Sequence, residues 1–403
     1  MDPAPANTPL PRAAAAIGHG IGDGLHRGAQ LYVSRDGRVI ADAAFGEARP
    51  GVAMTPDSVV LWLSSTKPVA AVAVAQLWER GLVALDDRVA AFISEFGVNG
   101  KDAITLRHIL THTAGFRGPL NNFAAGTWDE LVARACNLRQ EPGWVPGHKA
   151  GYHVASSWFV LGELVRRIDP QHRTFDRYVR EMIFEPLGLN DAWVGMPPER
   201  FRAYDADGRL AWMFSTEKDE PDPHTAGNDE PGNVIPRPGA NGRGPIRALG
   251  RLYESLLVAV TRPPPPSGGG GGEGARGGKV APLAARAPRL LNPQTIEAMT
   301  ARHRTGMYDQ TFRHVVDYGL GFIINSATYG ADTVPYGYGP HASSRAFGHS
   351  GAQSSLGMAD PEHGLVIAAA FNGMPGEARH HARMRELLGA IYEDLALAEP
   401  PGM

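Results

Sequence analysis

The chain opens with a helical pattern followed by two alternating segments. Residues 9–27 have the spacing of apolar positions that predicts a helix. Residues 29–34 and 38–45 then alternate between apolar and polar side chains enough to be strands. Asp36-Gly37 between them is a typical hairpin turn, so we expect the two strands to pair.

The middle of the chain reads mostly as helices. Residues 65–80 are apolar nearly all round, which is the pattern of a buried helix. Residues 198–245 are polar and rich in Gly, Pro and Asp, which predicts a long excursion outside the core. The Pro/Gly-rich stretch 262–280 cannot bury a core and is expected to form a flexible surface loop. Further helices are predicted at residues 105–111, 128–137, 153–168, 173–183 and 246–260.

The last part of the chain returns to strands and ends in a helix. Consecutive strands favour an antiparallel sheet with the N- and C-terminal helices packed on it. We therefore expect an α+β fold forming one catalytic unit over residues 1–403. An α/β subdomain would cover about 12–70 and 290–397, a helical subdomain about 71–260, and the active site would lie in the cleft between them. The strands are predicted at 319–325, 346–350, 354–360 and 364–371, and the helix at 377–396.

Composition and charge narrow the function classes. The 403 residues carry a formal net charge of -3, which does not suggest binding to nucleic acid or to an anionic membrane. The only cysteine is Cys136, so an intramolecular disulfide is excluded. The sequence shows neither the pattern of a signal peptide nor an apolar stretch of ~18–20 residues, and a cytoplasmic location is expected. No Cys/His/Asp cluster has zinc spacing, so neither a metal nor a cofactor is expected.

The strongest chemical signal is the Ser-x-x-Lys motif of residues 64–67, at the start of the apolar helix. Residues three apart share a helix face, so Lys67 can hydrogen-bond the hydroxyl of Ser64. A serine at a helix N-terminus also lies near free backbone N–H groups and the positive end of the helix dipole. Both effects favour an alkoxide-like oxygen, which makes Ser64 the candidate nucleophile. Alone, the motif is better explained by a capping serine followed by a solvated lysine.

A tyrosine before the next predicted helix strengthens this interpretation. Tyr152 follows Gly151 and precedes His153. A tyrosine held beside a lysine ammonium has its phenolate favoured, so Tyr152 could take the Ser64 proton and later pass it to the leaving group. Read alone, Tyr152 is a packed aromatic residue whose hydroxyl caps a loop.

The segment 347–352, Phe-Gly-His-Ser-Gly-Ala, is a predicted edge strand lining the cleft. Gly351 allows a substrate to approach the backbone closely. The backbone N–H of Ala352, together with that of Ser64, could form an oxyanion hole. Alone, this segment is simply a strand that contains glycines.

In combination these segments resemble the serine β-lactamase and penicillin-binding-protein superfamily. The sequence is most similar to class C β-lactamases and family VIII carboxylesterases, in which a Tyr motif replaces Ser-Asp-Asn. The resemblance implies a β-lactamase-like fold in which Lys67 and Tyr152 activate Ser64. It runs from about residue 12 to 395 and also rests on the stretches 81–87, 104–115 and 318–322.

Two departures from the class C pattern bear on the substrate. The third position of Tyr-x-Asn is Val154, and Lys-Thr-Gly has become His349-Ser350-Gly351. In the family, the Asn amide and the Lys ammonium help to bind the amide carbonyl and the carboxylate of a β-lactam. Their loss argues against strong β-lactamase activity and resembles the esterase and transacylase branches.

The sequence therefore predicts a serine hydrolase that acts on small carboxylic esters through an acyl-Ser64 intermediate. One alternative is a transacylase that moves the acyl group to an amine or alcohol acceptor in natural-product biosynthesis. Another is a non-catalytic descendant that binds a partner or forms filaments, which the retention of Ser64, Lys67 and Tyr152 argues against. The candidate substrate contacts are His349, Ser350, Gly351, Trp144 and His153.

Overall fold

A seven-stranded sheet lies at the centre of the part of the chain that the computed structural model describes, residues 9–218, 220–223, 227–261 and 289–398. The strand order is β10-β11-β12-β13-β1-β2-β3, and neighbouring strands are antiparallel. The fold is therefore α+β, as expected from the run of strands near the C-terminus. The strands are β1 Gly28–Arg35, β2 Arg38–Arg49, β3 Val52–Ala53, β10 Ile323–Ile324, β11 Phe347–Gly351, β12 Ser355–Asp360 and β13 Leu365–Phe371.

The hairpin between β1 and β2 turns at the predicted dipeptide. Asp36 and Gly37 have φ values of 51° and 74°, and Arg35 pairs with Arg38 across them. Positive φ at both central residues is the requirement of a type I′ turn, which Asp-Gly satisfies at low cost. The turn chemistry thus sets the register of the first two strands.

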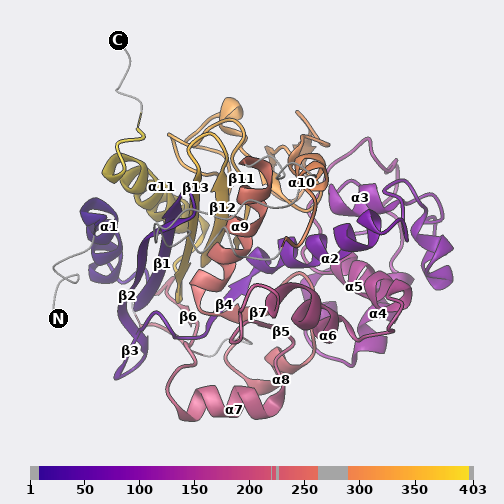
Figure 1. Ribbon diagram of the computed structural model, residues 1–403. Helices are drawn as coiled ribbons and strands as arrows, with labels where there is room; N and C mark the ends of the chain where they lie inside the picture. Colours follow the sequence, from indigo (N-terminus) through magenta and orange to yellow (C-terminus); the bar gives the residue numbers. More distant parts are fainter. Residues whose placement is uncertain (1–8, 219, 224–226, 262–288, 399–403) are drawn as a thin grey trace, which may run out of the picture.

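Helices cover both faces of the sheet. On one face α1 (Pro11–Gly22) packs beside α11 (Glu377–Asp394), so the two ends of the described chain meet (Figure 1). On the other face α9 (Ile246–Thr261) packs on β1, β12 and β13. Alternation along β1 serves both faces, because Leu31 and Val33 join the apolar cluster under α1 and α11 while Tyr32 joins the cluster on the other side.

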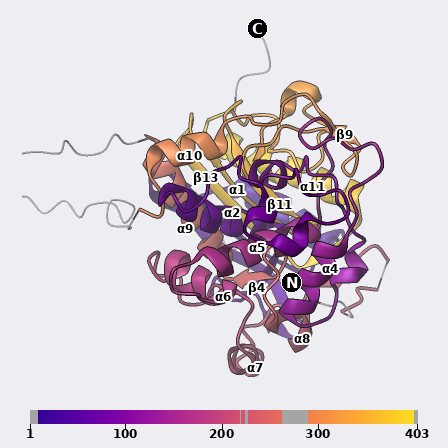
Figure 2. The ribbon, with the colours of Figure 1, turned by 90° about the vertical axis from the view of Figure 1, so that its right-hand side faces the viewer.

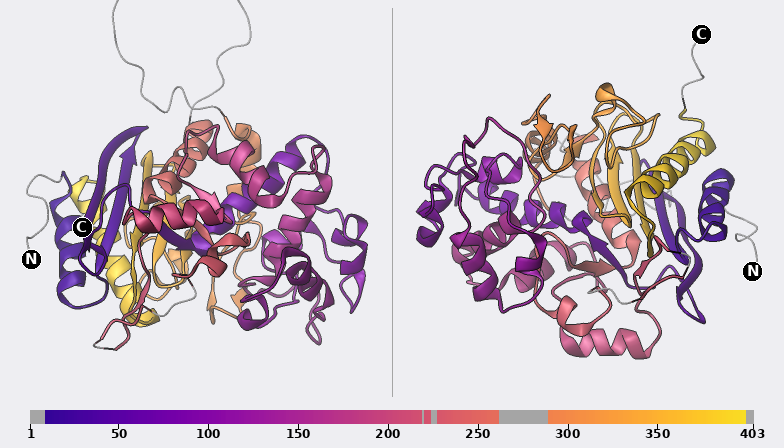
Figure 3. Two further views of the ribbon diagram at one scale, coloured as in Figure 1. Left: turned by 90° about the horizontal axis from the view of Figure 1, so that it is seen from below. Right: turned by 180° about the vertical axis from the view of Figure 1, so that it is seen from behind.

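Most of the remaining helices lie beside the sheet, on the side away from α1 (Figures 2 and 3). The central one, α2 (Lys67–Glu79), is buried along nearly its whole length and packs on α5 (Ser156–Ile168). An all-apolar helix without a polar face is the pattern of a helix surrounded by protein, as predicted. The others are α3 Leu106–Leu110, α4 Trp128–Asn137, α6 Phe175–Val179, α7 Pro198–Ala206, α8 Glu230–Val234 and α10 Pro293–Thr300.

The interpretation of residues 198–245 as an excursion outside the core is wrong. This stretch contributes β7 (Gly242–Gly244), which pairs with β4 (Val60–Leu63) and β5 (Trp193–Val194). Arg243 of β7 is fully buried, and its guanidinium donates to backbone carbonyls and to Asn233. A buried arginine can be satisfied by backbone carbonyls. A core strand built around such a residue lacks the apolar alternation by which strands are predicted.

Three short pairings complete the secondary structure. β6 (Phe214–Ser215) pairs parallel with β14 (Gly373–Met374), and β8 (Tyr308–Asp309) pairs antiparallel with β9 (His314–Val315). None of the described helices is both long and apolar enough to cross a membrane. The loop predicted at 262–280 lies outside the described residues.

Other predicted boundaries shift for local reasons. The helix expected to run to residue 27 ends at Gly22, because Gly24 adopts a φ of 67° and turns the chain toward β1. The strand expected at 319–325 shortens to β10, because Gly321 has a φ of 84° and bends the segment before it.

Candidate active site

Ser64 lies at the start of a tight turn between β4 and α2. β4 ends at Leu63, whose φ of 47° and ψ of -131° are unusual for a residue with a side chain. Ser64 to Thr66 form a single 3₁₀ turn that leads into α2. The Thr66 hydroxyl donates to the Leu63 carbonyl at 2.6 Å and accepts from the Gly242 N–H at 2.8 Å, which holds the turn in place. Ser64 is half-buried, so its hydroxyl is accessible.

Lys67 makes the contact that the Ser-x-x-Lys spacing predicts. Its Nζ lies 3.0 Å from Ser64 Oγ, 3.0 Å from the Val154 carbonyl and 2.8 Å from the Gly239 carbonyl. The side chain is fully buried, and burial lowers the pKa of Lys67 well below its ordinary value. An amine that donates two N–H groups to the two carbonyls presents its lone pair to Ser64.

Tyr152 lies beside this pair. Lys67 Nζ is 4.9 Å from the centre of the Tyr152 ring, and the phenol and the Ser64 side chain are hydrogen-bonded. Burial raises the pKa of Tyr152 and the carboxylate of Asp309 raises it further, whereas the bond with Ser64 lowers it. The raised pKa speaks against the expected stabilised phenolate, because the burial of Tyr152 and the carboxylate of Asp309 both disfavour the charged form. Tyr152 is therefore a neutral phenol beside a lysine whose pKa is lowered by burial.

Strand β11 runs alongside the serine turn. The Ser65 hydroxyl donates to the His349 carbonyl at 3.0 Å and also contacts the Ser355 hydroxyl at 2.9 Å, so Ser65 is buried and fully engaged. A side chain at Gly351 would place its Cβ 2.4 Å from the Trp62 carbonyl, which explains the glycine. Ala352 follows in the exposed turn after the strand. The end of β11 thus lies against the residues that lead into Ser64.

His349 is buried under the site and carries no charge. Its Nδ1–H donates to the Ser350 carbonyl at 2.8 Å, and its ring centre is 5.9 Å from that of Tyr152. Burial and the neighbouring Lys67 lower the pKa of His349 to about 3. A neutral imidazole therefore occupies the place of the Lys ammonium in Lys-Thr-Gly.

Two predicted substrate contacts have partners inside the protein. Trp144 is buried, and its Nε1–H donates to the Thr113 carbonyl at 2.9 Å. His153 is fully buried, its backbone N–H donates to Nδ1 of His112 at 3.0 Å, and its ring packs on Phe116. Both lie behind the Tyr152 loop, and a role in binding substrate stays a prediction for each.

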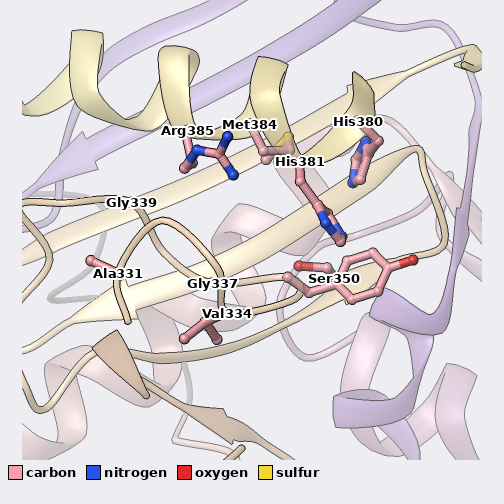
Figure 4. A pocket seen from close by; sticks show the side chains of 10 residues that line it. Ala331, Val334, Gly337, Gly339, Ser350, His380, His381, Met384 and Arg385 are labelled. Carbon is pink, nitrogen blue, oxygen red and sulfur yellow. The ribbon is translucent and has the colours of Figure 1, made fainter. Parts of the chain in front are cut away.

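A hollow of about 340 Å³, counting the part open to solvent, lies on the other side of β11. In Figure 4 the ring of His381, on α11, points toward Ser350 of β11. Tyr336 also lines this hollow, and its ring lies 5.9 Å from that of Phe312, which stacks on Tyr152 at 4.6 Å. A row of aromatic rings therefore separates the hollow from the catalytic groups. Its remaining lining includes Val334, His380, Met384 and Arg385.

The groups that hold Lys67 and Tyr152 are not marked by the sequence motifs. The carbonyls of Val154 and Gly239 accept from Lys67, and every residue has a carbonyl, so no sequence signal marks them. Asp309 accepts the backbone N–H of Tyr152 at 3.0 Å from 157 positions along the chain. No local pattern connects Asp309 with Tyr152, so this contact could not be predicted from the sequence.

The described residues contain no group of three or more His, Cys, Asp or Glu side chains that could hold a metal ion. The chemistry assembled here is that of a serine, a lysine and a tyrosine in contact.

Comparison with known proteins agrees with this geometry. Esterase/beta-lactamase LipL of Mycobacterium tuberculosis is 26% identical over 368 residues, which cover 86% of this chain and 77% of LipL. The structure of a penicillin-binding-protein homologue from Caulobacter crescentus superposes with a TM-score of 0.74 at 27% identity and covers 98% of this chain and 99% of that one. The structure of a family VIII carboxylesterase gives a TM-score of 0.74 at 26% identity, with 96% and 98% covered.

The family model described as Beta-lactamase matches residues 13–391, nearly the whole chain. Relatives of the chain are named as esterases, penicillin-binding proteins and β-lactamases. The chain belongs to the β-lactamase family.

Proposed function

We propose that the protein is a serine esterase that hydrolyses small carboxylic esters through an acyl-Ser64 intermediate. The observation that carries this proposal is the environment of Lys67. Two backbone carbonyls occupy two of its hydrogen-bonding directions, and the third faces Ser64 Oγ at 3.0 Å. A buried lysine with a lowered pKa in that position is a base for the serine hydroxyl.

The reaction proceeds in two halves. Lys67 takes the Ser64 proton as Oγ attacks the ester carbonyl, and the N–H groups of Ser64 and Ala352 stabilise the oxyanion. Tyr152, a neutral phenol bonded to Ser64, gives its proton to the departing alkoxide and regains one from the Lys67 ammonium. Water then attacks the acyl-enzyme with the same groups in reverse, which releases the acid and restores Ser64.

The surroundings favour an ester over a β-lactam. His349 is neutral, so it supplies no cation for the carboxylate of a β-lactam. Val154 has no side-chain amide to bind the amide carbonyl of a β-lactam. Its backbone carbonyl already accepts a hydrogen bond from Lys67.

The direct test compares an ester and a β-lactam as substrates of the purified protein and then adds an acyl acceptor. We expect turnover of p-nitrophenyl butyrate and at least about 100-fold lower kcat/KM for a chromogenic cephalosporin, since the missing contacts are worth at least one charge-assisted bond each. Butanol or butylamine added as acceptor should divert only a minor share of the acyl group. A larger share on the acceptor would favour the transacylase, and failure of a fluorophosphonate to label the protein would favour the non-catalytic descendant.

A further inference from the structure

The hairpin formed by β8 and β9 holds the backbone on both sides of Tyr152. Asp309 Oδ1 accepts the Tyr152 N–H at 3.0 Å, and the Thr311 hydroxyl donates to the Tyr152 carbonyl at 3.0 Å. Between these two hairpin residues, the Gln310 N–H donates to the carbonyl of Ala150, two residues before Tyr152, at 2.9 Å. Residues 309–311 therefore satisfy the backbone groups of a segment that belongs to neither a helix nor a sheet.

The same hairpin fixes the Tyr152 side chain. The ring of Phe312 stacks on that of Tyr152, with the centres 4.6 Å apart and the planes at 28°. Asp309 Oδ1 also accepts the N–H groups of Thr311 and Phe312, at 2.8 Å and 3.0 Å, so one carboxylate oxygen sets the position of both the tyrosine and the ring that covers it.

Asp309 is itself held rigidly. It is fully buried and forms an ion pair with Arg304, 3.0 Å away and also fully buried. Arg304 in turn donates to the carbonyls of Val316 and Thr111 and lies 4.4 Å from the Tyr318 ring. A buried carboxylate is costly unless it is paired and hydrogen-bonded. Asp309 meets this need with Arg304, with the N–H of Tyr152 and with the N–H groups of Thr311 and Phe312 in its own hairpin.

We propose that the β8–β9 hairpin positions Tyr152 for proton transfer to the leaving group, with Asp309 and Thr311 as its positioning residues. The proposal rests on the proposed function, because it assigns Tyr152 the role of proton donor. It goes beyond the three residues of the reacting cluster, since neither Asp309 nor Thr311 touches the reacting atoms. Its chemical consequence is selective: only esters whose leaving group needs a proton depend strongly on the placement of Tyr152.

The test uses Thr311, because it is exposed and its substitution is expected to leave the protein folded. Thr311→Val loses the bond to Tyr152, and Thr311→Ser keeps it. For an ethyl ester we expect kcat to fall about fivefold in Thr311→Val, the effect of one hydrogen bond, with KM unchanged. For the p-nitrophenyl ester, whose leaving group needs no proton, kcat should fall less. Thr311→Ser should match the unsubstituted protein on both esters.

Asp309 gives a second, larger effect. Asp309→Ala removes the acceptor of three N–H groups and should lower kcat for the ethyl ester about 100-fold, since a misplacement of 1 Å can cost that much. Asp309→Asn keeps an acceptor oxygen and should restore most of the rate. Losses of equal size on both esters, or no loss in Thr311→Val and Asp309→Ala, would overturn the proposal.

The positioning role can be tested even if the proposed function fails. Should the unsubstituted protein hydrolyse neither ester, the proposed function fails, and crystal structures of that protein and of Asp309→Ala then decide the positioning role. A Tyr152 hydroxyl displaced from Ser64 in the variant supports the proposal, and an unmoved one contradicts it.

Discussion

In the proposed mechanism, Tyr152 and Lys67 divide the proton transfer between them, and the division follows from the opposite directions of their pKa shifts. Lys67 is the group whose pKa is lowered, and Tyr152 the one whose pKa is raised, so the base is the amine and the phenol starts with its proton. The rate should rise with pH as Lys67 loses its proton, because only the free amine can accept the Ser64 proton. As the pH falls through the lowered pKa of Lys67, activity is lost.

This division predicts the behaviour of Tyr152→Phe. Loss of the hydroxyl should lower kcat for an ethyl ester by ~10²- to 10⁴-fold, the usual contribution of a positioned acid, and lower it less for a p-nitrophenyl ester. The acidic limb of the pH–rate profile should remain, since it belongs to Lys67. If that limb instead vanishes with the hydroxyl, the base is the Tyr152 phenolate.

At the residue scale, local motifs indicate the candidate reacting side chains but not their charge. The spacing of Ser64 and Lys67 alone predicts their contact, because positions three apart meet on a helix. The rise of the Tyr152 pKa comes from the burial of Tyr152 itself and from Asp309, which is remote in sequence. Burial by distant segments leaves no mark in the local motif.

Strand β11 can approach the serine turn closely because position 351 is a glycine. Its close approach to the serine turn at Gly351 leaves no room for a Cβ, which would lie 2.4 Å from the Trp62 carbonyl and 2.3 Å from Ser355 Oγ. Any side chain there must push the strand away from Ser64 and widen the proposed oxyanion hole.

Gly351→Ala should therefore cost both stability and rate. We expect the free energy of unfolding to fall by about 1–3 kcal/mol, as for other overpacked sites, and acylation of Ser64 by a fluorophosphonate to slow. The matched control is Gly18→Ala on α1, where nothing lies within 4 Å of the added Cβ. That change should be neutral or slightly stabilising. Denaturant unfolding and labelling rates that are equal in both variants would contradict the account.

Element boundaries were predictable where local chemistry decides them. Helix α4 spans the predicted residues 128–137, because Thr127 and Glu130 form a capping box at its start. The reverse holds for β7, whose Gly-Arg-Gly sequence has no strand pattern and is buried only through β4 and β5. Pairing between segments far apart in sequence overrides local propensity there.

The molecule as a whole builds its site from three distant parts of the chain. The serine turn enters between the sheet and the helices, the Tyr152 loop comes from the helical side, and β11 belongs to the sheet (Figure 1). Such an arrangement buries polar groups at the junction, and neutral histidines are among them. Burial lowers the pKa of His153 and of His349 to about 3.

These histidines predict acid sensitivity of the fold. The folded-state pKa of about 3 lies below the unfolded value of about 6.5, so the unfolded chain binds more protons between these values. Stability is full above pH 6.5 and falls as the pH drops toward 3. Each histidine should cost roughly 2 kcal/mol between pH 7 and pH 5. Urea unfolding at the two pH values measures this.

A matched pair of variants identifies the source of the loss. His153→Gln should flatten the pH dependence, whereas His19→Gln, at an exposed position, should leave it unchanged. A free energy of unfolding that does not change between pH 7 and pH 5 would show that the buried histidines titrate normally.

The central claim is that Ser64 forms the acyl-enzyme, and intact-mass measurement of the protein after treatment with an activated ester or a fluorophosphonate tests it most directly. The unsubstituted protein and Ser65→Ala should each gain the mass of one adduct, because Ser65 is buried and already bonded to His349 and Ser355. Ser64→Ala should gain none while remaining folded. An adduct of the same mass on Ser64→Ala would contradict the account.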